Sequence, residues 1–207
     1  MTQDGGTRAA RREQAVEALL DAALESLVTV GFAATTTRGV AQLAGVSQGL
    51  QQHYFPTKAA LIDAAILRLA GRLLDEASQP VEGATERDRA RHLLRRVWDS
   101  YRSPVLAVVA ELLVLARTHP DTAEKTASTL VAVTGRVVEV AEMAMPTYAR
   151  HAGFRDALLL ALSAIRDTTT VTRIPGTAPA VPTLESITAA FLRAVGGHRI
   201  SRAREIG

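Results

Sequence analysis

The segment SQGLQQHY at residues 47–54 gathers hydrogen-bonding side chains in a form that suits contact with another molecule. Ser47 is a good helix N-cap, and the residues after it are enough for about two turns of helix. We expect Gln48, Gln51 and Gln52 to point outward from that helix. An exposed helix rich in amides suits the major groove of DNA, because a glutamine can bond an adenine edge through two atoms. The amides alone would mean little without a frame that presents them.

That frame is predicted by the residues that precede the amides. Two short helices are expected over residues 36–44 and 47–54, separated by Gly45 and Val46. Two short helices joined by a tight turn that contains glycine form a helix-turn-helix. Apolar residues that would fix the crossing of the two helices are Val40, Ala44, Val46, Leu50 and Tyr54.

The rest of the chain shows an almost continuous helical period, interrupted by glycine and proline. Gly31 closes the first helix, Thr57 caps the fourth, Ser103-Pro104 starts the sixth and Pro146 stops the seventh. The expected helices cover about 11–30, 36–44, 47–54, 57–79, 85–101, 103–118, 120–144, 154–171 and 184–195. The prediction is an all-α fold of about nine helices: residues 1–56 with a flexible tail at 1–7, a larger bundle over 57–196, and a basic tail at 197–207.

Composition excludes several kinds of chemistry. The 207 residues carry a net charge of +3 and no cysteine, so disulfides, thiol nucleophiles and thiolate metal sites are ruled out. The five histidines are scattered, and no nucleophile elbow, phosphate-cradling loop or carboxylate cluster is present. We therefore expect no catalytic residue, metal site or cofactor. The N-terminus lacks an apolar signal core, and the longest apolar stretch, 105–116, is interrupted by Glu111 and too short for a bilayer. This predicts a cytoplasmic protein without a membrane partner.

Residues 31–61 resemble the DNA-binding region of the TetR family of transcriptional regulators. The residues that match the family's pattern in one register are Gly31, Phe32, Thr35, Thr36, Val40, Ala41, Ala44, Gly45, Val46, Ser47, Gly49, Tyr54, Phe55, Lys58 and Leu61. The resemblance covers about the first third of the chain, and the remainder agrees in helix count and order. It implies a DNA-binding domain at 1–56, an effector-binding and dimerisation domain at 57–196, and a repressor that leaves a palindromic operator when a small molecule binds.

The resemblance also implies roles for single residues. The predicted DNA-binding set is Thr36, Arg38, Ser47, Gln48, Gly49, Gln51, Gln52, His53, Tyr54 and Lys58. Of these, Thr36, Arg38, His53, Tyr54 and Lys58 would contact phosphates, and Gln48, Gly49 and Gln52 would face bases or backbone. Free N–H groups at helix N-termini favour anions, and Lys58 adds a positive charge at one. An arm formed by Arg8, Arg11 and Arg12 would run along the backbone or in the minor groove.

The sequence departs from the family pattern at three positions. Gln51 stands where an apolar residue is common and Gln52 where tyrosine is common, so Leu50 would take over the packing and Gln52 the phosphate contact. Gly39 replaces a common acidic residue, which weakens the first short helix. Alternatives stay open: Tyr54 as a core residue, Arg38 as a solvated surface residue, and His53 as either a phosphate contact or an exposed residue without a role.

In the bundle, the predicted ligand-binding residues are Trp98, Tyr101, Glu111 and Leu115. Glu111 interrupts an apolar helix, where an unpaired buried charge is costly, so it would anchor a ligand or pair with Arg117 or Arg136. The alternative for Trp98 is that it is an ordinary residue of the apolar core. Aromatic residues are scarce, which favours an aliphatic effector over a flat one.

The last two helices, 154–171 and 184–195, carry apolar stripes with small alanines and are predicted to form a four-helix homodimer interface. The alternative is that these stripes pack inside one subunit. Two other classes of protein are alternatives to the regulator: an all-α enzyme, for which no motif is present, and a helical adaptor with a vestigial helix-turn-helix. An activator or a global regulator would share the same DNA-binding region.

Overall fold

The computed structural model describes residues 4–103, 106, 109, 116–117 and 120–196. These residues form nine α-helices and one short 3-10 helix and contain no strand, which confirms the predicted all-α fold. By their packing they divide into a first unit, Met1–Leu73 with Ala107–Thr129, and a second unit, Leu74–Leu106 with Leu130–Gly207. Both α4 and α7 contribute residues to each unit, so these units differ from the functional division predicted at residue 57.

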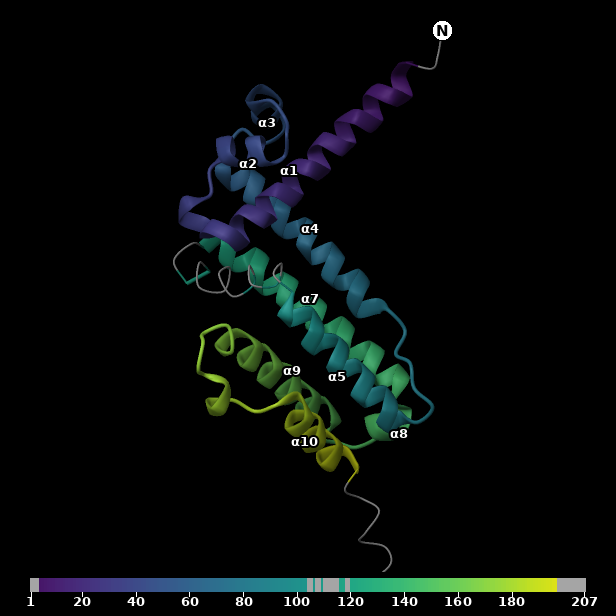
Figure 1. Ribbon diagram of the computed structural model, residues 1–207. Coiled ribbons are helices and arrows are strands. Elements are labelled where there is room, and N and C mark those ends of the chain that lie inside the picture. The colour runs from purple at the N-terminus through teal and green to yellow at the C-terminus, as the bar shows by residue number, and fades with distance from the viewer. Residues whose placement is uncertain (1–3, 104–105, 107–108, 110–115, 118–119, 197–207) are drawn as a thin grey trace, which may run out of the picture. The chain divides into compact units, whose positions relative to one another are not determined.

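The first unit contains α1 (Asp4–Ala34), α2 (Thr37–Leu43), α3 (Gln48–Tyr54) and most of α4 (Lys58–Ser78) (Figure 1). α1 begins inside the segment predicted as a flexible tail, because the run after Gly6 is rich in strong helix formers. Gly31 interrupts it with a φ of 77°, where the sequence predicts its end. The buried apolar residues of α1 and α4 include Leu19, Ala23, Leu24, Leu27, Leu61, Ile62, Ala65, Ile66 and Leu69.

The second unit is built around α5 (Glu86–Arg102), the later part of α7 (Pro120–Ala144), α9 (Phe154–Val171) and α10 (Leu184–Gly196). The predicted limits of α7 and α9 agree with the structure. Two short elements were not predicted: α8 (Pro146–Ala149) and η1 (Ala178–Ala180). The helix expected over 103–118 lies almost entirely outside the described residues. Among the described residues, no helix combines the length and the apolar character needed to span a bilayer.

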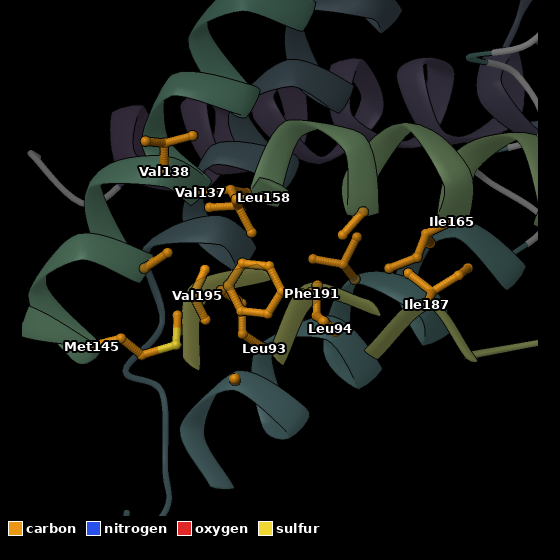
Figure 2. Close-up of a cluster of buried hydrophobic side chains, with 14 of the residues drawn as sticks. Leu93, Leu94, Val137, Val138, Met145, Leu158, Ile165, Ile187, Phe191 and Val195 are labelled. Carbon is orange, nitrogen blue, oxygen red and sulfur yellow. The ribbon is translucent and has the colours of Figure 1, made fainter. Parts of the chain in front are cut away.

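The core of the second unit joins α5, α7, α9 and α10 (Figure 2). Leu93 and Leu94 of α5 are fully buried, and the rings of Phe154 and Phe191 meet edge to face with centroids 5.9 Å apart. The stripes expected to form a dimer interface are used here. Their buried members are Phe154, Leu158, Ala161, Ile165, Thr168, Leu184, Ile187 and Phe191. These stripes therefore follow the alternative interpretation, because α5 offers them an apolar partner within the same chain.

Polar side chains of α5 hold the corner between α7 and α8. The Glu86 carboxylate accepts hydrogen bonds from the backbone N–H groups of Thr147 and Tyr148, both at 2.9 Å. One turn further along, Arg89 donates to the Ala144 carbonyl at 2.8 Å. Burial raises the pKa of Glu86, but the two backbone hydrogen bonds and Arg89 outweigh it, and the pKa lies below its ordinary value. One face of α5 thus satisfies the end of α7 and the start of α8.

Candidate nucleic-acid interface

α2 is the first helix of the predicted helix-turn-helix, and its start is well defined. Thr36 has an extended backbone conformation, and its Oγ1 accepts a hydrogen bond from the Gly39 N–H at 3.0 Å. Val40 and Ala41 form the buried face of the helix. Arg38, on the same helix, is exposed. The structure therefore leaves Arg38 accessible, while the hydroxyl of Thr36 is occupied as a cap.

The turn between α2 and α3 depends on Gly45, whose φ is +68°. Side chains other than glycine rarely adopt this left-handed conformation. The N–H of Val46 bonds the carbonyl of Ala41 at 3.0 Å and closes the turn. Ser47 then caps α3 as predicted, because its Oγ accepts from the Leu50 N–H at 3.2 Å. These contacts fix how α3 follows α2.

α3 presents one continuous exposed face. Gln48, Gly49, Gln52 and His53 are all exposed. Residues three or four apart lie side by side on a helix, so these four form two adjacent rows. Around Gly49 an added Cβ would meet nothing within 4 Å, so packing within the chain does not require glycine there. We call these four residues the α3 face.

Gln51 does not belong to the α3 face, and the prediction that it points outward is wrong. Its side chain is completely buried, and Nε2 donates to the Phe55 carbonyl at 2.6 Å. Its Oε1 is buried without a hydrogen-bond partner among the described residues. Position on the helix decides this: Gln51 shares the inward side with Leu50 and Tyr54, which are both half-buried. The apolar residue common at this position in the family pattern was the signal for burial.

Lys58 is the first residue of α4, where Thr57 is the N-cap as predicted and accepts from the Ala60 N–H at 3.1 Å. The Lys58 ammonium donates to the Phe32 carbonyl at 2.5 Å and lies 4.3 Å from the centre of the Phe32 ring. Burial lowers the pKa of Lys58. The predicted phosphate contact thus points toward the end of α1 in this structure.

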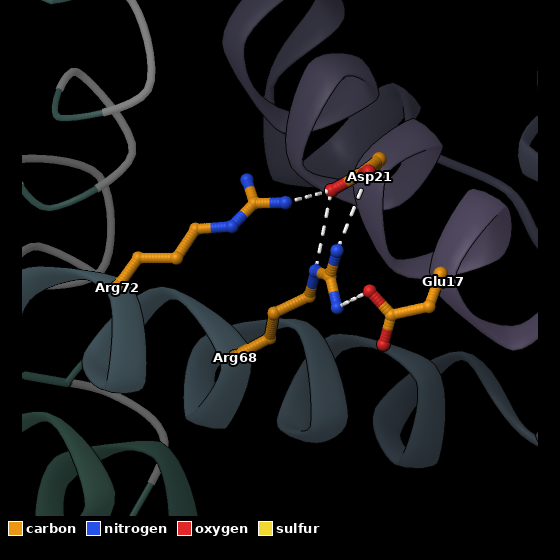
Figure 3. A network of polar contacts seen from close by, with 4 residues as sticks. All are labelled: Glu17, Asp21, Arg68 and Arg72. Atoms are coloured by element: carbon orange, nitrogen blue, oxygen red, sulfur yellow. Dashed lines mark hydrogen bonds and ion pairs between the residues drawn. The ribbon is translucent and has the colours of Figure 1, made fainter. Parts of the chain in front are cut away.

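An ion-pair network that the sequence analysis missed joins α1 to α4 (Figure 3). Arg68 pairs with Glu17 and, at 3.2 Å, with Asp21; Arg72 reaches Asp21 at 2.5 Å. Glu17 and Asp21 are four residues apart, and so are Arg68 and Arg72. This matched spacing of opposite charges on two helices was the available signal. The network fixes α4 against α1 and so supports the frame of the α3 face.

The residues predicted to bind a ligand lie in the second unit or outside the described residues. Trp98 and Tyr101 are half-buried at the edge of the apolar core. Burial raises the pKa of Tyr101, and Arg166, which bonds its hydroxyl, opposes this. Glu111 and Leu115 fall outside the described residues. A hollow of about 410 Å³ in this unit contains neither aromatic residue; it is lined by Glu76, His92, Arg95, Arg96, Asp99 and Ser100. The predicted ligand-binding set therefore stays a prediction.

Comparison with known proteins supports the interpretation of the first unit. Residues 19–65 match the family model for bacterial regulatory proteins of the TetR family. The regulator BetI of Rhizobium meliloti is 41% identical over 80 residues, which are 38% of this chain and 39% of BetI. An uncharacterised HTH-type transcriptional regulator of Mycobacterium bovis is 30% identical over 131 residues, 63% of this chain and 65% of the relative. The chain thus spans about two fifths of the length of BetI and about two thirds of the mycobacterial protein.

The likeness to solved structures reaches across both units. A transcriptional regulator from Rhodococcus sp. is similar to this chain with a TM-score of 0.65 and 25% sequence identity, over 88% of this chain and 94% of that one. The arrangement of helices after residue 65 therefore agrees with a known regulator although the sequence is less similar. The two comparisons lead to one conclusion: over residues 19–65 the chain matches the TetR family of bacterial regulatory proteins, and as a whole it shares the fold of a transcriptional regulator.

Proposed function

We propose that this protein is a DNA-binding transcriptional regulator, a repressor that a small-molecule effector releases from a palindromic operator. The observation that carries the proposal is the α3 face, four exposed residues on a helix held by two caps and a left-handed turn. Gln48 and Gln52 can each bond an adenine edge in the major groove. Because Gly49 has no side chain, the DNA backbone can approach α3 closely at this position. Arg38, exposed on α2, is placed to contact a phosphate.

The test is binding of the purified protein to fragments of the DNA upstream of its own gene. Wild-type protein should bind one fragment tightly and lose affinity steeply as salt rises. Gln52→Ala should weaken binding to that fragment about 5- to 100-fold and relax its sequence preference, since a bidentate contact contributes about 1–3 kcal/mol. Gln42→Ala removes another exposed amide, on α2 outside the α3 face, and should bind normally. Failure to bind any upstream fragment would refute the proposal.

A homodimer follows from the small size of the motif, because one helix of two turns reads few base pairs. Two copies separated by about 34–36 Å would enter successive major grooves of a palindrome. The inward stripes of α9 and α10 are used within the chain, so we place the contact on their outward faces. There Leu160 is 71% exposed, and Ala190 and Ala194 of α10 are exposed as well. Small residues allow close approach of a second pair of helices.

Leu160→Arg tests this assignment. The variant should sediment as a monomer and lose tight operator binding, since an unpaired charge would enter an apolar contact. Met143→Arg is the matched control: Met143 of α7 is 67% exposed in the same unit, and its variant should remain a dimer. A dimeric Leu160→Arg protein with unchanged affinity would show that the outward face of α9 is not the interface.

The proposed effector-binding residues are Trp98 and Tyr101 on α5, and Glu111 and Leu115 further along the chain. A coupling of about 1–3 kcal/mol between effector and DNA is typical and needs only different affinities in two conformations. Trp98 is the one tryptophan of the chain, so its fluorescence reports binding directly. An effector should change this emission and lower operator affinity at the same concentrations. Compounds that release DNA while leaving Trp98 fluorescence unchanged would place the site elsewhere.

A further inference from the structure

The α3 face is the surface that would meet base pairs, and it carries no lysine or arginine. Its residues are Gln48, Gly49, Gln52 and His53, and neither cation occurs anywhere in α3, although the chain has 24 such residues. An arginine or lysine that bonds guanine is the commonest sequence-specific contact in the major groove. The α3 face therefore lacks the side chains that most often select guanine.

The two exposed amides are the side chains of this face that can select one base. A glutamine amide donates to adenine N7 and accepts from the amino group at adenine N6, so it fits that base through two hydrogen bonds. Gln48 and Gln52 are exposed, whereas the amide of Gln51 is used inside the chain, where it donates to Phe55. Two of the three amides of α3 are thus available to DNA.

The spacing of the two amides limits which base pairs they can reach. Gln48 and Gln52 lie in one row because they are four residues apart. Four residues of α-helix rise about 6 Å, and stacked base pairs are about 3.4 Å apart. The amides therefore reach base pairs that are neighbours or next neighbours in the stack. If each contacts its own adenine, one copy of α3 reads two A·T pairs within three consecutive base pairs.

The second row of the α3 face, Gly49 and His53, is compatible with this use of the amides. Gly49 has no side chain, so α3 can lie close to the duplex and bring the amides within reach of base edges. An imidazole ring carries its two nitrogens on different sides, so His53 cannot form the paired contact that an amide forms. Its ring lies edge-on to that of Tyr54, with centroids 5.1 Å apart. Selection of particular bases therefore falls to the two glutamines.

We propose that each half-site of the operator contains two A·T pairs, adjacent or separated by one pair, and that Gln48 and Gln52 each select one of the two adenines. This inference rests on the proposed function, since it names the sequence that the α3 face recognises. It leaves positive charge to residues outside α3, among them Arg38, which is exposed on α2. Sequence preference and attraction to phosphates then come from different side chains.

Selection from a library of duplexes with a random central region tests this inference with the full chain. The bound half-sites should share two A·T pairs within three consecutive positions, each with adenine on a fixed strand. Gln48→Ala and Gln52→Ala should each remove the preference at one position, a different one for each variant, and keep it at the other. Gln42→Ala changes an exposed amide on α2 and should select the same half-sites as the wild type.

A base analogue tests the same contacts without altering the protein. 7-Deazaadenine pairs with thymine as adenine does but lacks N7, so an amide that contacts it loses one of its two hydrogen bonds. At one of the two selected adenines, the analogue should weaken wild-type binding about three- to tenfold. The variant that lacks the amide for that position should bind the modified and unmodified duplexes equally. Gln42→Ala should lose affinity as the wild type does.

Two results would overturn the inference and leave the proposed function intact. One is a set of selected half-sites that require G·C pairs where α3 contacts them. The other is an analogue that leaves wild-type affinity unchanged, or that weakens all three glutamine variants equally. A library that yields no bound sequence would refute the proposed function, and this inference with it.

Discussion

The two units of this protein are held in shape by different kinds of contact. In the first unit, hydroxyl caps, one left-handed glycine, a buried glutamine and the Lys58–Phe32 contact fix short helices over an apolar base. In the second unit, long helices converge on one apolar core with Phe154 and Phe191 at its centre. Directional contacts demand particular residues at particular positions, whereas apolar packing accepts many residues of similar volume. The family match, over residues 19–65, lies in the first unit.

The largest expected effect lies in the apolar core. Phe191→Ala should lower the free energy of unfolding by about 3–5 kcal/mol, since it removes a buried ring from contact with Phe154. Phe191→Leu should cost less, about 1.5 kcal/mol or below, if volume is what the core requires. Urea unfolding followed by circular dichroism measures both. Equal losses for the two variants would show that the core depends on ring geometry and would weaken the contrast between the units.

A smaller effect is expected where the first unit depends on backbone conformation. Gly45→Ala should cost about 1–2 kcal/mol, because φ is +68° and no neighbouring atom lies within 4 Å to add a steric contribution. Asparagine tolerates this conformation better, so Gly45→Asn should cost clearly less. Chemical unfolding of the two variants checks the order. If alanine were accepted without loss, the turn would not need its left-handed residue.

The corner held by Glu86 should make the second unit sensitive to acid. The pKa of Glu86 is lowered in the folded protein, so its carboxylate contributes fully to the free energy of unfolding above the unfolded pKa of about 4.3. That contribution is lost as pH falls through the lower pKa of the folded protein. Glu86→Gln should cost about 1 kcal/mol at neutral pH and flatten the acid limb of a stability profile. Unfolding measured from pH 3 to 7 tests this. An identical acid limb in the variant would assign the sensitivity to other carboxyl groups.

The smallest effect is expected at Gly49, with the opposite sign. Gly49→Ala should raise the free energy of unfolding by about 0.5–1 kcal/mol, since alanine favours helix and the space around the Cβ is empty. Operator affinity should nevertheless fall, because the new methyl group stands on the α3 face. Gly45 and Gly49 thus form a matched pair in one motif. A Gly49→Ala protein that is more stable and binds equally well would remove Gly49 from the interface.

Much of the fold could be predicted because local residue types determine where helices begin and end. Pro120, Pro146 and the caps Ser47 and Thr57 place their helices correctly, since each acts through its own backbone geometry. The start of α1 lies earlier than predicted, inside the expected flexible tail. The short helix α8 was missed because the N–H groups at its start are satisfied by Glu86, which precedes Thr147 by 61 residues.

The site was predicted less completely because residue type was given more weight than helical position. Gln51 was assigned outward as an amide, although its register places it with Leu50 and Tyr54. The contacts of Lys58 with the carbonyl and the ring of Phe32 were not predicted, and its phosphate contact stays a prediction. The stripes of α9 and α10 were identified correctly as apolar, but a stripe does not reveal whether its partner is α5 or another subunit. In each case the missing information is tertiary.

The carboxylate of Glu86 has a consequence for hydrogen exchange. First-turn amides of a helix normally lack an acceptor within it and lose their protons to solvent quickly. The amides of Thr147 and Tyr148 do have an acceptor, because both donate to the Glu86 carboxylate of α5, a helix that lies much earlier in the sequence. Their deuterium uptake should therefore be slow for as long as α5 stays in place against this corner. These two backbone positions offer a readout of the second unit that needs neither DNA nor effector.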